Sequence, residues 1–117
     1  MTSELKTPTS LIESLENGPV DFSEVMKVID ENYNFTSVAF RNGNTNNAEN
    51  TNNGSCKVFS FAKLHNLSVQ ATLNAFGDYY MVDVLQNPKN DDHQNIRNFI
   101  EFGWDGIEFT GKALAER

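Results

Sequence analysis

Apolar and polar residues alternate with a period that changes along the chain. Over residues 21 to 32 the apolar positions recur at i, i+3, i+4 and i+7, which predicts an amphipathic helix with one buried face. These positions are Phe22, Val25, Met26 and Ile29. Asp21 is placed to cap this helix.

The same spacing returns in several shorter segments. The other predicted helices cover residues 10 to 16, 55 to 64, 69 to 76 and 93 to 102. A serine at the start of each of the first three segments, or just before it, suits the N-cap position. In the second of them Phe61 falls outside the apolar stripe, so we expect this helix to be buried on two sides. Residues 79 to 85 fit a helix or a strand, and we favour a helix because Tyr80 and Val84 share a helical face.

The period changes to two between Tyr33 and Arg41, which predicts a strand. Asn42-Gly43 then favours a tight turn, and a short returning strand is expected within residues 45 to 50. A further short strand is expected within residues 103 to 111, between glycines. The fold class is therefore α+β: about five short helices packed on a small, mainly antiparallel sheet.

With 117 residues the chain is long enough for one domain with its own core. We expect a flexible tail over residues 1 to 9 and a single domain over residues 10 to 117. The start of the chain lacks the apolar run of a signal peptide, and no segment has the length of a membrane span. One cysteine allows no disulfide within the chain, as in proteins of a reducing compartment.

Charge narrows the classes of partner. The net charge is -7, and the nine basic residues are scattered singly. Nucleic acids and anionic membranes both require clustered positive charge, so we exclude them as partners. We expect a monomer, and an unknown protein partner stays an alternative.

Cys56 follows the glycine-serine pair Gly54-Ser55 and allows two interpretations. If Ser55 caps a helix, the thiol lies at its first residue, where the helix dipole and the neighbouring Lys57 would favour a thiolate nucleophile. Alternatively, Cys56 is a small residue packed at a helix start, because free cysteine is commonly buried.

His93 is the matching candidate base, in the first turn of a helix that Asp91 or Asp92 caps and Gly103 ends. If the two helix starts converge, Cys56 and His93 could form a thiol–imidazole pair, which Asp92 would orient. Convergence would also create an anion pocket with Ser55, Lys57 and Arg97 as ligand-binding residues. The alternative is a polar first turn that faces water.

Three aromatic residues are candidates for ligand contacts. Tyr79, Tyr80 and Trp104 combine an apolar ring with a polar tip, as residues at binding sites and at core edges both do. For metals the sequence offers no suitable spacing, because His65 and His93 lie far apart and no CxxC pair occurs. The asparagine-rich residues 42 to 53 carry only one carboxylate, Glu49, too few for calcium. We expect no metal and no cofactor.

Five motifs occur in a recognisable order: GSCKVFSFA, TLNAFGDYY, DVLQNP, DHQNIRNFI and GWDGIEF. Together they resemble the HopJ type III effector family, over about residues 22 to 114. One departure is Ser37-Val38, where the family is expected to have Pro-Thr. The resemblance implies a compact α+β domain from a Gram-negative bacterium, but it implies no activity and supplies no catalytic residues to transfer to this chain. It implies a location in the bacterial cytoplasm or, after type III secretion, in the host cytosol.

Three functions follow from these observations. The first is a non-enzymatic effector or binding protein that acts by contact with a partner. The second is a small thiol-dependent enzyme for acyl transfer or hydrolysis, with Cys56 and His93. The third is a housekeeping cytosolic protein that binds a ligand.

Overall fold

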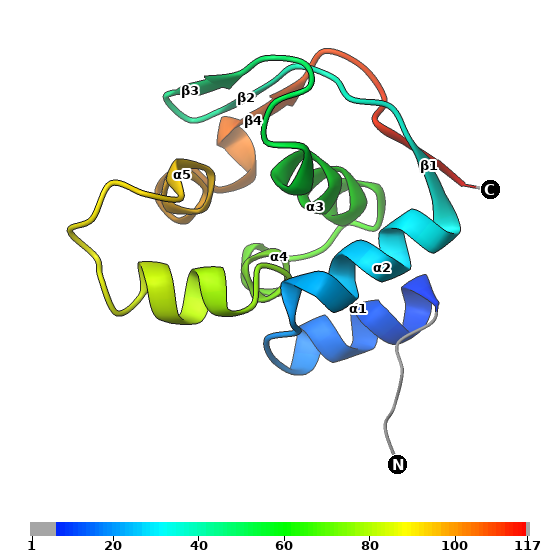
Figure 1. Cartoon of the computed structure of the whole chain (residues 1–117), viewed down its shortest axis with the longest axis horizontal. Helices are drawn as coiled ribbons and strands as arrows, with labels where there is room; N and C mark the ends of the chain where they lie inside the picture. Colours follow the sequence, from blue (N-terminus) through cyan, green and yellow to red (C-terminus); the bar gives the residue numbers. More distant parts are fainter. Residues whose placement is uncertain (1–6, 117) are drawn as a thin grey trace.

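Helices dominate the chain, and strands enter as short pieces between them and near the C-terminus. The computed structural model describes residues 7 to 116 and is drawn in Figure 1. Its helices are α1 (Pro8–Asn17), α2 (Phe22–Asn32), α3 (Asn53–Leu64), α4 (Val69–Asn74), the π-helical η1 (Tyr79–Val84), α5 (Gln94–Phe102) and the 3-10 turn η2 (Gly103–Gly106). Its strands are β1 (Tyr33–Phe35), β2 (Phe40–Asn42), β3 (Thr45–Asn47), β4 (Ile107–Phe109) and β5 (Leu114–Glu116). The predicted α+β class, with short helices on small antiparallel sheets, is confirmed.

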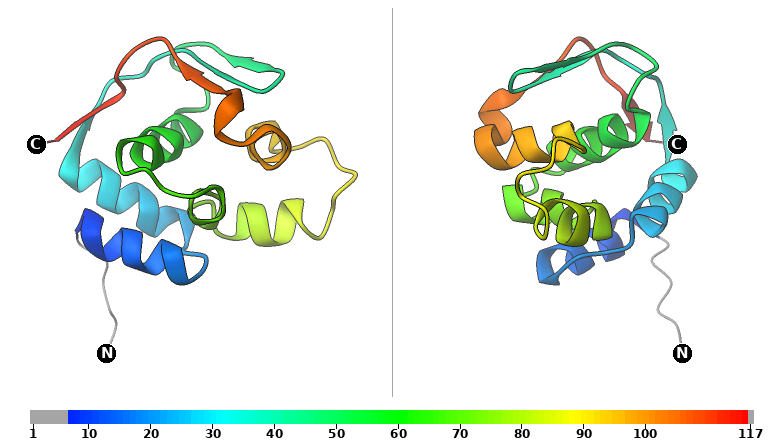
Figure 2. Two further views of the ribbon diagram at one scale, coloured as in Figure 1. Left: turned by 180° about the vertical axis from the view of Figure 1, so that it is seen from behind. Right: turned by 60° about the vertical axis from the view of Figure 1, so that its left-hand side comes forward.

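The helices gather on one side of the strands, as the views in Figures 1 and 2 agree. α3 lies in the middle and contacts α2, α4 and β5. α1 packs against α2 and α4, while α5 packs against α4 and the strands β2 and β3. A helix in this central place is buried on several sides, which explains why its apolar residues do not form a single stripe.

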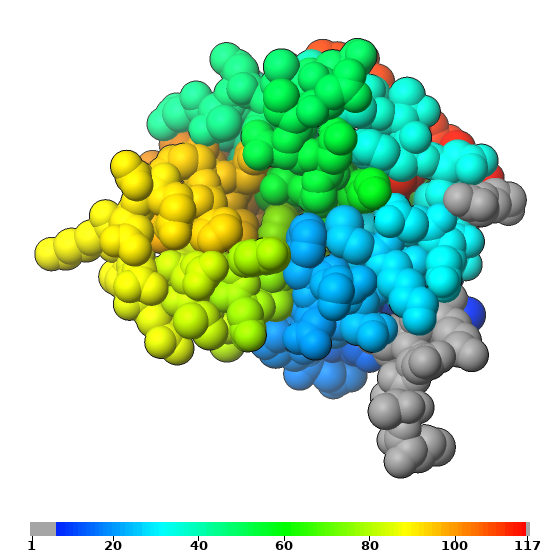
Figure 3. Space-filling view, in the orientation of Figure 1, coloured from blue at the N-terminus to red at the C-terminus, as the bar shows by residue number. Residues whose placement is uncertain are grey.

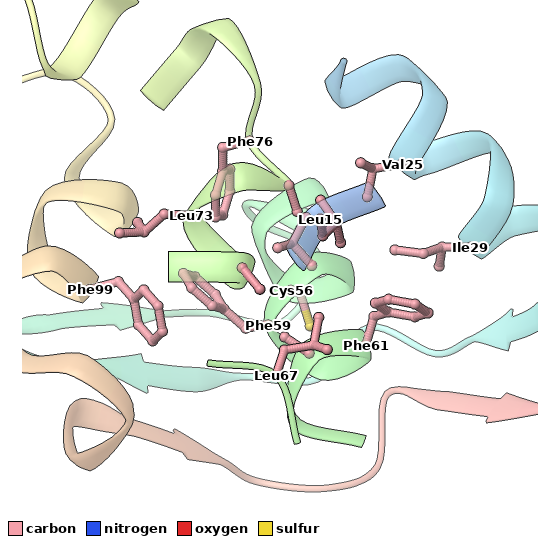
Figure 4. Packing of buried hydrophobic residues seen from close by; sticks show 14 of the residues in the cluster. Leu15, Val25, Ile29, Cys56, Phe59, Phe61, Leu67, Leu73, Phe76 and Phe99 are labelled. Carbon is pink, nitrogen blue, oxygen red and sulfur yellow. The ribbon is translucent and has the colours of Figure 1, made fainter. Parts of the chain in front are cut away.

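Aromatic rings around α3 form the centre of the core (Figure 4). The ring of Phe59 lies 4.9 Å from that of Phe99 and 5.4 Å from that of Phe76, centroid to centroid. Phe61, on another face of the helix, is 1% exposed. The predicted burial of this helix on two sides is confirmed. Burial of each phenylalanine contributes about 1.5–3 kcal/mol, so this cluster is a main source of stability.

The strands form two small antiparallel sheets, β1–β5 and β3–β2–β4, which follow one another along the same two chain segments and are together called the ribbon. β1 pairs with β5, β2 pairs with β4, and β3 pairs with the other edge of β2. Phe35 pairs with Leu114, and Phe40 pairs with Phe109. The two pairings are therefore separated by the same number of residues on each side, 36–39 on one and 110–113 on the other. The ribbon therefore keeps its register across this gap.

Backbone hydrogen bonds mark both borders of the gap. The Thr36 N–H donates to Ala113 O (2.8 Å), and the Thr110 N–H donates to Ala39 O (3.0 Å). Between them the ribbon opens, so the predicted uninterrupted strand from Tyr33 to Arg41 is wrong over residues 36 to 39.

The polar groups of Ser37 and Val38 bond elsewhere, which explains the opening. The Ser37 hydroxyl donates to Asn53 Oδ1 (2.9 Å) and accepts from the Asn50 N–H (2.6 Å). The Val38 carbonyl accepts the S–H of Cys56 (3.9 Å). These contacts hold the strand against the start of α3 instead of its partner strand. The departure noted in the sequence, Ser37-Val38, lies at this opening.

The first helix begins earlier than expected. Thr7, not Ser10, is the N-cap of α1, and its Oγ1 accepts a hydrogen bond from the Ser10 N–H (3.1 Å). Pro8 occupies the first turn, where a missing N–H costs no helical bond. The predicted tail over residues 1 to 9 is therefore wrong for Pro8 and Thr9, and its residues 1 to 6 lie outside the described residues.

The second half of the chain follows the sequence pattern more closely. Ser68 caps α4 as predicted, with its Oγ accepting from the Ala71 N–H (3.1 Å). The ambiguous segment is helical, as η1. The two expected short strands are β3 and β4. Within the described residues, no helix combines the length and the apolar character needed to cross a membrane.

Candidate functional site

A cleft of about 450 Å³ opens where the N-terminal ends of α3 and α5 meet. Figure 3 shows the surface hollowed where α3, α5 and the start of η1 come together. Ser55 lines it from α3, and His93 and Gln94 line it from the start of α5. Rings of Phe22, Phe76 and Tyr79 form an apolar wall. Convergence of the two helix starts, which the sequence analysis treated as a condition, is therefore present.

α3 begins at this cleft because Asn52 turns the chain. Asn52 has φ +50°, in the left-handed region that asparagine tolerates better than most residues. Its side chain does not cap the helix but donates from Nδ2 to Asn47 Oδ1 (2.7 Å). Gly54 lets the helix approach α2, because a Cβ there would lie 2.8 Å from Cζ of Phe22. The predicted cap Ser55 is wrong: Ser55 is the third residue of α3, and its side chain lines the cleft.

α5 begins in the same way. His93, with φ +51°, is the N-cap residue, and its side chain makes no capping bond. The predicted caps Asp91 and Asp92 are therefore wrong. The imidazole lies 3.0 Å from Asp83 through Nε2 and Oδ2, and 5.2 Å from the Tyr79 ring. The N-cap side chains Asn52 and His93 therefore accept no hydrogen bond from the first backbone N–H groups of their helices.

Buried asparagines fix the two helix starts relative to each other. Asn95, in the first turn of α5, accepts from Asn42 Nδ2 and Asn47 Nδ2 at its Oδ1, both at 3.0 Å. Its own Nδ2 donates to Asn47 Oδ1 (2.9 Å), which also accepts from Asn52. These bonds join α5 to β2 and β3, and join β3 to Asn52, so the network ties α5 and the β2–β3 hairpin to the start of α3. The cleft is consequently held by a rigid polar frame.

Cys56 lies deeper than its predicted place at the helix start. It is the fourth residue of α3, and its N–H donates to Asn52 O (3.0 Å), so it has no free amide in the first turn. Its side chain has zero exposure and sits within the core (Figure 4). Burial raises the pKa of the Cys56 thiol, against a smaller opposing effect of the Val38 carbonyl and the Ser60 hydroxyl. The surroundings thus favour the neutral thiol.

The pairing of Cys56 with His93 stays a prediction. The S–H of Cys56 points to the Val38 carbonyl, while His93 faces Asp83 and the cleft. Asp92, the proposed orienting residue, lies 4.0 Å from His93 Nε2, farther than Asp83. This arrangement supports the packing role of Cys56.

The predicted cationic ligands have partners outside the cleft. Arg97 Nη2 contacts Asp92 Oδ1 (2.7 Å), and its Nε donates to Asp92 O (2.6 Å). The Arg97 guanidinium is the main cause that lowers the pKa of Asp92. Lys57 Nζ lies 2.7 Å from Asp30 Oδ1 and 5.0 Å from the Phe35 ring centroid. Both side chains stabilise neighbouring segments, and neither lines the cleft.

Two of the three aromatic candidates are placed apart from the cleft. The Trp104 Nε1–H donates to Leu67 O (3.0 Å), and the ring packs edge-on against Phe99 at 5.1 Å. Tyr80 is 7% exposed and belongs to the core. Of the predicted ligand-contact residues, Ser55 and Tyr79 line the cleft. Within residues 7 to 116, no three His, Cys, Asp or Glu side chains are grouped to hold a metal ion.

Sequence reasoning missed two of the three residues of the apolar wall. Phe22 and Phe76 read as core positions of their helices, and no local signal showed that their rings also border a cleft. Tyr79 was among the aromatic candidates, and the structure places it in the wall, 44% exposed.

One of the comparisons with known proteins identifies a family. A family model described as HopJ type III effector protein matches residues 8–114. The chain belongs to the HopJ type III effector family. The resemblance predicted from the five motifs is confirmed, and the match extends it to the first helix. This HopJ protein is also similar to a crystal structure described as unknown function protein VPA0580. The two are 48% identical over 100% of this chain and 97% of that chain, with a TM-score of 0.91. The search of curated proteins found no significant match.

Proposed function

We propose that this HopJ protein is a non-enzymatic binding protein and that the cleft between α3 and α5 holds its ligand. The observation that carries the proposal is the meeting of two helix N-termini at one cleft of about 450 Å³. This volume lies in the range of small-molecule sites, about 300–1,000 Å³. The buried thiol, whose pKa is raised by burial, supports binding rather than thiol chemistry.

The chemistry of the cleft indicates the ligand's polar part. Residues 53 to 55 and residues 94 and 95 open their helices, so their N–H groups have no acceptor one turn earlier within the helix. Such groups bind carboxylate or phosphate oxygens, with help from the helix dipoles. Ser55 adds a hydroxyl. A ligand with hydrogen-bond acceptors at one end therefore matches this side of the cleft.

The opposite side indicates an apolar or aromatic part. Phe22, Phe76 and Tyr79 lie together, with Phe22 and Tyr79 in an edge-to-face contact at 5.2 Å. The acids Asp83 and Asp92 lie around His93, so a ligand of high negative charge would be repelled. An aromatic ring that carries a single carboxylate or phosphate satisfies both sides.

Titration with benzoate and with phenyl phosphate, followed by amide NMR of the full chain, tests the proposal. We expect the largest shifts at residues 53 to 55, 94 and 95. Ser55→Glu places a carboxylate in the cleft, keeps a residue suited to a first helical turn, and should abolish these shifts. Ser23→Glu is the matched control, because Ser23 is exposed in the first turn of α2. Equal binding by both variants, or the absence of shifts at the named amides, would overturn the proposal.

Delivery into a host cell is a second proposal, which rests on the description of the family as type III effectors. In this role the protein would act on a host partner after secretion. Fractionation of the bacterium and its host under secretion-inducing conditions tests it. Protein found only in the bacterial cytosol would favour the housekeeping ligand-binding role, and the cleft proposal would be unaffected.

A further inference from the structure

A second cavity, of about 330 Å³, lies along the C-terminal half of α3. Ser60, Lys63 and Leu64 line it from the helix, and residues 109 to 114 line it from the ribbon. It is separate from the cleft, which lies at the other end of α3. The twelve residues of this helix span about 18 Å.

This cavity lies at the opening of the ribbon. Residues 110 to 113 connect β4 to β5, and the backbone bonds of Thr110 to Ala39 and of Thr36 to Ala113 mark the two ends of the opening. Gly111 and Lys112 lie between these bonds, and both line the cavity.

Apolar side chains form much of the cavity wall. Leu64 is 44% exposed, unusually high for a leucine next to the core. Phe109 is half-buried, and Leu114 forms the base at 3% exposed. A bound apolar chain would cover the exposed part of Leu64 and remove it from water.

Two lysines border the same wall. Lys63 Nζ lies 5.5 Å from the Phe109 ring centroid, and Lys112 follows Gly111 in the open segment. Among the described residues, neither lysine forms an ion pair. In a chain of net charge -7, with only nine basic residues, two unpaired lysines at one cavity form a local positive region.

We propose that this cavity binds a small amphipathic anion: a carboxylate held by Lys63 and Lys112, on a short apolar chain that packs on Leu64, Phe109 and Leu114. The positive charge selects the head group, and the apolar wall selects the chain. The volume is near the lower limit of small-molecule sites, about 300 Å³, so the occupant is a small molecule rather than a peptide. This site is additional to the cleft and uses none of its residues.

Hexanoate is the probe, titrated into the full chain and followed by amide NMR. Acetate supplies the head group alone, and hexan-1-ol supplies the chain without charge. We expect hexanoate to shift the amides of Lys63, Leu64 and residues 110 to 113, and to bind more tightly than either control. Hexan-1-ol binding as tightly as hexanoate would overturn the role of the lysines. Shifts confined to residues 53 to 55, 94 and 95 would overturn the site itself and would assign the carboxylate to the cleft.

Charge variants test the head group. The double variant Lys63→Gln, Lys112→Gln should weaken hexanoate binding by at least about tenfold, since each charge at contact distance contributes a few-fold or more. The control is Lys27→Gln, Lys89→Gln, which removes the same charge from exposed positions on α2 and in the loop before α5. Equal losses in both double variants would show a nonspecific effect of net charge and overturn the proposal.

Leu64→Glu tests the apolar wall without disturbing the interior, because Leu64 is already partly exposed. It should abolish hexanoate binding and leave benzoate shifts at the cleft unchanged. Retained hexanoate binding in a folded Leu64→Glu protein would overturn the proposal. Because the two sites have different probes and different variants, failure of this site and failure of the cleft are distinguishable.

Discussion

The hydroxyl oxygen of Tyr33 and Nε2 of His65 lie 2.5 Å apart, which joins the start of β1 to the residue that ends α3. Burial lowers the pKa of His65, against a smaller opposing effect of Glu116. Burial also raises the pKa of Tyr33, with Glu116 acting in the same direction. At neutral pH the phenol is therefore the donor, and the neutral imidazole is the acceptor.

This pair predicts a loss of stability in mild acid. The unfolded chain binds a proton at His65 near pH 6.5, above the lowered pKa of the folded state, so the free energy of unfolding decreases as the pH falls below about 6.5. Urea unfolding between pH 5 and pH 8 measures the decrease. His65→Gln should flatten the curve in this window. An unchanged curve in His65→Gln would contradict the assignment to His65.

Cys56 is predicted to be unreactive in the folded protein. The buried thiol, with a raised pKa, should react with iodoacetamide at pH 7 at least about tenfold more slowly than glutathione, and unfolding in urea should restore the rate. Mass spectrometry of the alkylated protein over time measures both rates. A folded-state rate above that of glutathione would revive the catalytic pairing with His93.

Asn95→Ala is predicted to destabilise the frame of the cleft. It removes two hydrogen bonds of Asn47 and one acceptor of Asn42 Nδ2, all in a buried region. The expected loss is about 2–3 kcal/mol in the free energy of unfolding. Asn46→Ala is the control, since Asn46 is exposed and should change stability by less than about 0.5 kcal/mol. Similar urea midpoints for the two variants would mean that the network contributes little.

Gly77→Ala is predicted to destabilise the turn between α4 and η1. Gly77 has φ +57°, and a Cβ there would lie 2.8 Å from Val20 O, so the change combines backbone strain with a clash. The expected cost is at least about 1 kcal/mol. Gly111→Ala is the matched control, because its Cβ would meet only Val38 Cγ1, at an ordinary 3.5 Å. Thermal unfolding compares the two, and an equal effect would refute the argument.

Local sequence patterns were sufficient for most helices. The apolar spacing of α2 and the Ser68 cap of α4 are short-range features, and both predictions were right because nearby residues determine them. The family was likewise predictable, because its motifs are present in the sequence.

Long-range contacts explain the errors. Asn52 and His93 begin their helices from left-handed conformations, which the asparagine network and the Asp83 contact stabilise from distant segments. The break in the predicted strand depends on bonds from Ser37 and Val38 to the start of α3. No local pattern contains these partners.

The candidate site was predictable only in part. The sequence predicted an anion pocket if the two helix starts converge, and Ser55 and His93 do line the cleft. It could not show that Arg97 pairs with Asp92 and that Lys57 pairs with Asp30, because the sequence does not indicate which basic side chains form ion pairs. It also could not show the direction of the Cys56 side chain, which depends on how α3 packs.

The antiparallel ribbon has a consequence for how the protein is made. β1 pairs with β5 and β2 pairs with β4, so residues 107 to 116 must leave the ribosome before the ribbon can close. Until then the apolar face of α3 that packs against the ribbon is exposed, so it can bind chaperones or promote aggregation. Pairing between such distant segments is also slow to form, because a large loop must close first. Emergence of residues 107 to 116 is thus the step that allows this domain to reach its native state.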